Sequence, residues 1–168
     1  MTLRMKKTRD LVLTALFAAL IFVATYSIKM PLAQGYIHFG DAFIYITACL
    51  LPLPYAAVAA AFGGALSDAL SGYAIYIIPT LIIKALLVIP FTCKKEKLIN
   101  TRNILAPILA GVIGLLGYFT AETILYGAGT AFANAIMGSI QPVGSLFIFY
   151  AVAYIFDKLS LKDKINMR

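Results

Sequence analysis

The sequence has few charged residues for its length. Of its 168 residues, only 12% are Asp, Glu, Lys or Arg, 62% are hydrophobic, and the mean hydropathy is +0.92. A soluble domain has about 25% charged residues, which it needs to cover a surface that faces water. The composition therefore excludes a soluble domain. It predicts an all-α integral membrane protein, small enough for residues 1–168 to form a single domain.

Residues and motifs that carry chemistry are also scarce. The two cysteines, Cys49 and Cys93, lie in or beside apolar runs without metal-ligand spacing, and they are too few for a disulfide framework. The chain has no Walker A, HExxH or GxSxG motif, which argues against an enzyme, a bound metal or cofactor, and ATP hydrolysis by this chain. Tryptophan is absent, so any aromatic stacking on a ligand falls to tyrosine or phenylalanine.

The net charge of +7 would suggest nucleic acid in a soluble protein, but here the basic residues are confined to three segments. Such segments beside apolar runs mark the cytoplasmic side of a membrane protein. The positive charge therefore indicates which side of the membrane the loops face, and it indicates no nucleic-acid partner. The three segments contain Arg4, Lys6, Lys7 and Arg9; Lys94, Lys95, Lys97 and Arg102; and Lys158, Lys162, Lys164 and Arg168, leaving only Lys29 and Lys84 elsewhere.

Six apolar runs predict six transmembrane helices, with both termini in the cytoplasm and a lipid bilayer around them. The first run is interpreted as a retained span and not as a signal peptide. Pro52 and Pro54 end the second run early, and the segment GAGTAF turns the chain between the last two. The predicted helices cover approximately residues 10–28, 41–52, 55–70, 74–92, 104–126 and 133–156.

Polar residues recur at helical spacing inside three of these runs, in the series that start at Tyr76, Tyr118 and Asn134. Residues spaced by three or four positions share one helix face, so three polar faces predict a common cavity that opens toward the outer side. The candidate substrate-binding residues are Tyr36, His38, Asp41, Asp68, Tyr73, Tyr76, Thr80, Lys84, Tyr118, Glu122, Asn134 and Gln141.

Simpler roles remain open for several of these side chains. Lys84 either reaches into the cavity, pairs with Glu122, or caps a helix carbonyl. Asp41 is also placed to act as the N-cap of the second helix. Asp68 and the tyrosines would equally suit the lipid interface.

The chain resembles the substrate-binding (S) components of energy-coupling factor (ECF) vitamin transporters over essentially its full length. The resemblance rests on six runs in a short chain, on Ala15-x-x-x-Ala19, and on HFGDAFIYITACLLPLPYAAVAAAFGGALSDALSGY followed by PTLIIKALL. The long run is similar to the subgroup of riboflavin-type, hydroxymethylpyrimidine and pyridoxine S components. It implies a vitamin pocket near the outer face, with the loop KMPLAQGYIHFG as a lid.

The resemblance also implies partners. Ala15, Ala18 and Ala19 would dock on a shared transmembrane coupling subunit of the EcfT type, and two ATPase subunits would use ATP to drive release inside. The mixed polar lining favours pyridoxine (vitamin B6) or hydroxymethylpyrimidine, with riboflavin as the alternative. A stand-alone proton-coupled carrier using Asp68 or Glu122 and a non-transporting assembly factor are the rival functions.

Overall fold

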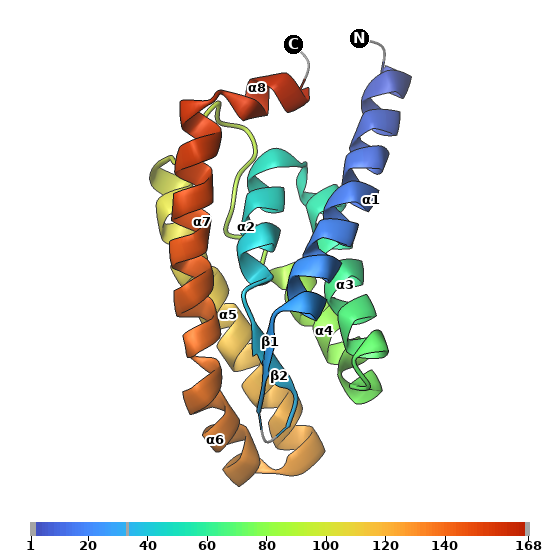
Figure 1. The fold of residues 1–168 in the computed structure, drawn as a ribbon, viewed down its shortest axis with the longest axis vertical. Helices are drawn as coiled ribbons and strands as arrows, with labels where there is room; N and C mark the ends of the chain where they lie inside the picture. The colour runs from blue at the N-terminus through green and yellow to red at the C-terminus, as the bar shows by residue number, and fades with distance from the viewer. Residues whose placement is uncertain (1–2, 33, 167–168) are drawn as a thin grey trace.

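The computed structural model describes residues 3–32 and 34–166 and consists almost entirely of helices (Figure 1). Arg168 of the basic tail and Ala33 of the predicted lid lie outside the described residues. Two three-residue strands, β1 (Lys29–Pro31) and β2 (Tyr36–His38), form an antiparallel hairpin between the first two helices. The helices are α1 (Leu3–Ser27), α2 (Asp41–Leu50), α3 (Leu53–Leu70), the 3-10 helix η1 (Ala74–Tyr76), α4 (Ile77–Leu86), α5 (Thr101–Tyr126), α6 (Ala128–Gly138), α7 (Ile140–Lys158) and α8 (Leu161–Asn166).

Four helical stretches in the described part of the chain are long and apolar enough to cross a membrane. They are Arg4–Ser27, Leu53–Leu70, Thr101–Tyr126 and Ala128–Lys158. The other two predicted spans are the shorter apolar helices Asp41–Leu50 and Ala74–Leu86. Ten helical residues rise only ~15 Å, about half of a ~30 Å hydrocarbon core. The helical prediction is confirmed, whereas six complete crossings stay a prediction.

Three predicted boundaries are wrong. The fourth helix ends at Leu86 instead of residue 92, and Pro90 lies in the turn that follows it. The last predicted helix, 133–156, is two helices, α6 and α7, separated at Ser139. The segment GAGTAF is no extended turn, because Gly127 alone separates α5 from α6. Its φ of 87° lies in the left-handed region that favours glycine.

Helix α2 lies at the centre of the fold, and nine of its ten residues are buried. Figure 1 shows α1, α3 and α4 on one side of it and α5 and α7 on the other. Tyr45 of α2 packs on Phe91 and Phe149, with ring centroids 5.1 and 6.0 Å apart. Helix α2 is too short to span a membrane alone, but the helices around it shield it from lipid.

The basic segments gather at one end of the bundle. In Figure 1, α1 begins and α7 ends at the same end, opposite the β1–β2 hairpin. Lys162 of α8 donates to the carbonyl oxygens of Cys93 and Lys95, at 2.8 and 2.6 Å. Asp157 of α7 accepts from the backbone N–H groups of residues 98 and 99, at 2.7 and 2.9 Å. The loop between α4 and α5 is thus fixed to the C-terminal helices.

Candidate functional site

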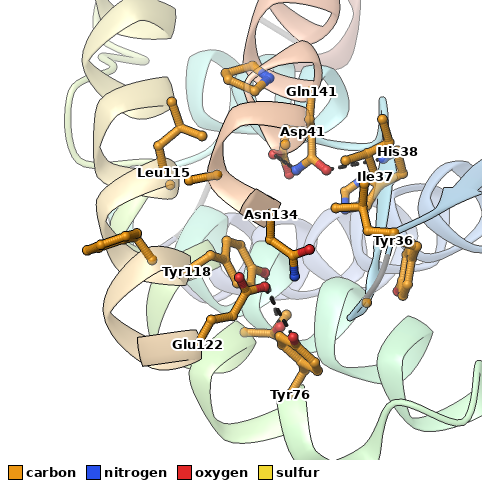
Figure 2. Close-up of a pocket in the computed structure, with 18 of the residues that line it drawn as sticks. Tyr36, Ile37, His38, Asp41, Tyr76, Leu115, Tyr118, Glu122, Asn134 and Gln141 are labelled. Atoms are coloured by element: carbon orange, nitrogen blue, oxygen red, sulfur yellow. Dashed lines mark hydrogen bonds between the residues drawn. The ribbon is translucent and has the colours of Figure 1, made fainter. Parts of the chain in front are cut away.

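A cavity lies between the β1–β2 hairpin, α3, η1–α4 and α5–α7 (Figure 2). The empty space among its lining atoms is about 790 Å³, including the part open to the outside. The lining residues are Leu32, Gln34, Gly35, Tyr36, Ile37, His38, Asp41, Tyr45, Asp68, Tyr73, Tyr76, Thr80, Ala110, Gly111, Gly114, Leu115, Tyr118, Phe119, Glu122, Asn134, Ala135, Gly138, Gln141 and Pro142.

One wall of the cavity joins the hairpin to the end of α3. The Tyr36 hydroxyl donates to Asp68 Oδ1 at 2.7 Å and lies 3.0 Å from the Ser67 hydroxyl. At the rim, Lys29 Nζ donates to Ser71 Oγ at 2.5 Å. Burial, together with the charge of Asp68, raises the pKa of Tyr36, so its hydroxyl stays protonated and remains a donor. These bonds fix the hairpin to α3.

The opposite wall comes from α5 and α6. Glu122 accepts from the Tyr76 hydroxyl at 3.1 Å (Figure 2). The Asn134 amide donates to the carbonyl of Gln34 in the hairpin at 2.9 Å. Thr80 and Tyr118 are joined by a hydroxyl–hydroxyl hydrogen bond of 3.0 Å. The hairpin therefore has polar contacts on both sides of the cavity.

Below the hairpin, Lys84 and Asp41 form a buried ion pair. Lys84 Nζ lies 2.6 Å from Asp41 Oδ1, and both side chains are almost fully buried. The predicted pairing of Lys84 with Glu122 is wrong, because Asp41 of the central helix α2 lies nearer its ammonium group. Lys84 also does not line the cavity. The N-cap role of Asp41 is likewise wrong, since Gly40 occupies that position and Asp41 begins the helix.

Gln141 connects this ion pair to the hairpin. Its amide nitrogen donates to Asp41 Oδ2 at 2.7 Å, and its amide oxygen accepts from the backbone N–H of His38 at 3.1 Å (Figure 2). One side chain from α7 thus contacts the ion pair beneath the cavity and the hairpin above it. Gln141 therefore holds α2, α7 and the hairpin together around the site.

The single histidine is buried and neutral. His38 Nδ1 accepts from the backbone N–H of Gly40 at 3.0 Å, which requires an unprotonated nitrogen. Burial, reinforced by the nearby charge of Lys84, lowers the pKa of His38 to about 3. This side chain shapes the turn from β2 into α2 and presents no positive charge to the cavity.

Tyrosine rings form a continuous surface along the cavity. The centroids of Tyr36 and Tyr73 are 5.1 Å apart, those of Tyr73 and Tyr76 6.4 Å, and those of Tyr76 and Tyr118 6.5 Å. Tyr126 lies 6.2 Å from Tyr76 but outside the lining. Since the sequence has no tryptophan, these tyrosine rings provide aromatic faces on which a planar ligand can stack.

The structure brings eleven of the twelve candidate residues to this cavity and leaves Lys84 behind it. That the cavity binds a substrate stays a prediction. Leu115, Tyr118 and Phe119 precede Glu122 by seven, four and three positions, and so they share its helix face. This spacing could therefore have predicted Leu115 and Phe119 as lining residues. Gln34 and Gly35 carried no such signal, because they lie in the turn of the hairpin.

The alanines predicted to dock on a partner lie on one side of α1 but differ in exposure. Ala15 and Ala19 are exposed on α1, whereas Ala18 is half-buried. A Cβ on Gly63 would lie 2.7 Å from the carbonyl oxygen of Ala18, so α1 and α3 are in close contact there. Ala18 therefore packs inside the bundle.

The described residues contain no group of three or more His, Cys, Asp or Glu side chains that could hold a metal ion. The polar groups of the cavity are hydroxyls, amides, carboxylates and the neutral imidazole of His38. Such a set can orient an uncharged or cationic small molecule by hydrogen bonds and stacking. It presents neither an activated nucleophile nor a phosphate-binding loop.

Comparison with known proteins shows similarity to a protein family and to a single related protein. The family model described as ECF-type riboflavin transporter, S component, matches residues 5–158. The chain is also similar to a protein of Pyrococcus woesei described as an uncharacterized protein in the gap 3' region. The two are 33% identical over 132 residues, which is 78% of this chain and 88% of that protein.

Proposed function

The chain belongs to the S components of ECF-type riboflavin transporters, a family of transmembrane proteins that bind substrate for vitamin uptake, and on this premise we propose that it is the high-affinity vitamin-binding subunit of an ECF importer. The observation that carries the proposal is the cavity under the hairpin, whose polar lining converges from several different elements. Concave sites with a few convergent polar groups are typical of small-molecule binding.

The proposed substrate is a small heterocycle such as pyridoxine or hydroxymethylpyrimidine. Amides and carboxylates around the cavity, among them Asn134, Gln141 and Glu122, suit the ring nitrogens and hydroxyls of these compounds. Riboflavin is the second candidate, because the matching family is described by that vitamin. A larger, neutral flavin would stack on the tyrosine surface and use fewer of the carboxylates.

We propose six membrane crossings with both termini in the cytoplasm. The two short helices would cross the membrane together with the residues that follow them. Helix α2 would cross with residues 51–52, and η1 and α4 would cross with residues 87–91. Irregular backbone is tolerated at membrane depth where protein or a water-filled cavity surrounds it. In this single domain, residues 1–168, the basic segments would face the cytoplasm and the hairpin the outside.

The proposed partners are an EcfT-type coupling subunit in the cell membrane and two ATPase subunits that use ATP on its behalf. No enzymatic activity is assigned to this chain. The contact with the coupling subunit would involve Ala15 and Ala19, whose small side chains let a partner helix approach closely. Ala18, which is half-buried beside them, would lie at the edge of this surface.

The test is to identify the bound molecule. Protein purified in mild detergent would be analysed by native mass spectrometry, and any ligand extracted and chromatographed. Pyridoxine, hydroxymethylpyrimidine or riboflavin in the extract, with matching affinity by calorimetry, would establish both the function and the vitamin. A protein that comes empty and binds none of a vitamin panel would contradict the proposal.

A further inference from the structure

The lining of the cavity carries three acidic groups, and its one histidine, His38, is neutral. Asp41, Asp68 and Glu122 all line it, and no lysine or arginine does. Within residues 3–32 and 34–166, Asp41 is the only one of the three that forms an ion pair, with Lys84. Asp68 and Glu122, both largely buried, therefore present two carboxyl groups to whatever fills the space.

One carboxyl oxygen lacks a hydrogen-bond partner. Asp68 Oδ1 accepts from Tyr36, whereas Asp68 Oδ2 is buried and has no hydrogen bond within 3.5 Å among the described residues, although the Thr80 side chain also interacts with this carboxyl group. Buried polar atoms in folded proteins nearly always have a partner, since leaving one without any costs about 1–3 kcal/mol. Asp68 lines the cavity, so a ligand toward which the Asp68 carboxyl group turns can supply a donor to this oxygen.

The tyrosine surface suits the same kind of ligand. Asp68 lies beside Tyr36, whose ring is the first in the series formed with Tyr73, Tyr76 and Tyr118. At the other end of the cavity, the Tyr76 hydroxyl is bonded to Glu122. Aromatic faces attract cations through their negative π surface, and they also stack on planar heterocycles.

We propose that the ligand carries a protonated nitrogen that binds Asp68, with Glu122 as a second negative group. This inference rests on the proposed function and narrows its substrate class to amine-bearing or basic nitrogen heterocycles. Neutral flavins would leave Asp68 Oδ2 without a charged partner. Phosphorylated vitamins would place a phosphate near two carboxylates, where like charges repel.

The experiment compares ligands that differ only at one nitrogen. Pyridoxamine replaces a hydroxyl of pyridoxine with an ammonium group and leaves the ring unchanged. Calorimetry on the purified full chain is expected to show pyridoxamine bound at least about tenfold more tightly than pyridoxine, as charged hydrogen bonds outweigh neutral ones. Riboflavin is measured alongside as a neutral ligand.

Two variants locate the effect. Asp68→Asn keeps an acceptor for Tyr36 but removes the charge, and it is expected to cut the amine preference to about twofold. Glu122→Gln should reduce it partly and serves as the second test if Asp68→Asn does not fold. Asp163→Asn, which makes the same charge change on exposed α8, is the matched control and should leave the preference intact.

The outcomes separate this inference from the function beneath it. Tight binding of riboflavin with no amine preference keeps the proposed function and overturns the inference. The same holds if an amine preference exists but survives in both carboxyl variants. If the wild-type protein binds none of these compounds, both the vitamin-binding function and the inference fail.

Discussion

Lys84 and Asp41 are the charged residues whose roles are easiest to separate by mutation. Losing one member of a buried ion pair leaves the other charge uncompensated and costs about 3–5 kcal/mol. We expect Lys84→Met or Asp41→Asn alone to lower the thermal unfolding midpoint markedly in detergent. The double variant should lose less than the sum of the two, because neither charge is then stranded.

The control for this cycle is Lys94→Met, which removes an exposed lysine from the loop at the far end of the bundle. It should leave the midpoint close to that of the wild type. A Lys84→Met protein that unfolds like the wild type yet binds no vitamin would contradict the structural role and make Lys84 a ligand contact.

His38 makes stability depend on pH. Its pKa is about 3 in the folded protein and ~6.5 when unfolded, so between these values the unfolded state binds more protons. Its contribution is therefore complete above pH ~6.5 and is lost as the pH falls toward 3, by up to about 1.4 kcal/mol per unit. The unfolding midpoint of the wild type should drop between pH 7 and 5.

A His38→Asn variant checks the assignment, since its amide oxygen can accept from Gly40 but does not titrate in this range. Its midpoint should fall less over the same two pH units than that of the wild type. Equal slopes for the two proteins would show that other groups cause the acid sensitivity.

Among single residues, sequence reasoning found the polar candidates but not their pairings. Spacing places Lys84 on a face with Thr80, yet it carries no information on which other helix meets that face. Asp41 and Lys84 are 43 positions apart, and their contact depends on the burial of α2 at the centre of the bundle. Spacing is local, whereas the packing of helices is not.

At the scale of elements, α1 provides a test of partner binding. Ala15→Trp and Ala19→Trp would add bulk where small side chains permit close helix contact. We expect each to reduce copurification with the coupling subunit at least about tenfold and to change vitamin affinity by less than about twofold, because α1 does not line the cavity. Affinity pulldown from co-expressing cells, with parallel calorimetry, measures both.

Val112→Trp is the matched control, since it adds a tryptophan to an exposed apolar position on α5. It should leave copurification unchanged. If the α5 variant disrupts the complex and the α1 variants do not, the docking surface lies on α5 instead.

The sequence predicts long helices well and short elements poorly. The long helices α1, α3 and α5 follow from continuous apolar runs, which exceed what a buried soluble helix needs. The hairpin was not predictable, because three-residue strands are too short to show alternation. The break at Ser139 carries no proline or glycine at the position itself, and only the structure locates it.

For the whole molecule, the orientation in the membrane can be tested by labelling. Gly129→Cys lies at the hairpin end, where an added Cβ would meet no atom within 4 Å, and Asp163→Cys lies on exposed α8. Both would be made in a Cys93→Ser background, where the remaining Cys49 is buried. A membrane-impermeant maleimide should label Gly129→Cys in intact cells and Asp163→Cys only after permeabilisation.

The reverse labelling pattern would place the cavity on the cytoplasmic side and would contradict uptake from outside. Labelling of both positions in intact cells would put them on the same side, so the chain between them would not make the single crossing proposed. The basic segments at one end of the bundle set the expected orientation in the membrane, because cytoplasmic loops carry an excess of Lys and Arg.

The tyrosine surface also makes the site its own spectroscopic reporter. Five of the ten tyrosines line the cavity, and the chain has no tryptophan to dominate its ultraviolet emission. Much of the intrinsic fluorescence therefore originates at the place where a vitamin would lie. An absorbing heterocycle in the cavity would quench that emission by energy transfer, so occupancy could be followed in real time without a label.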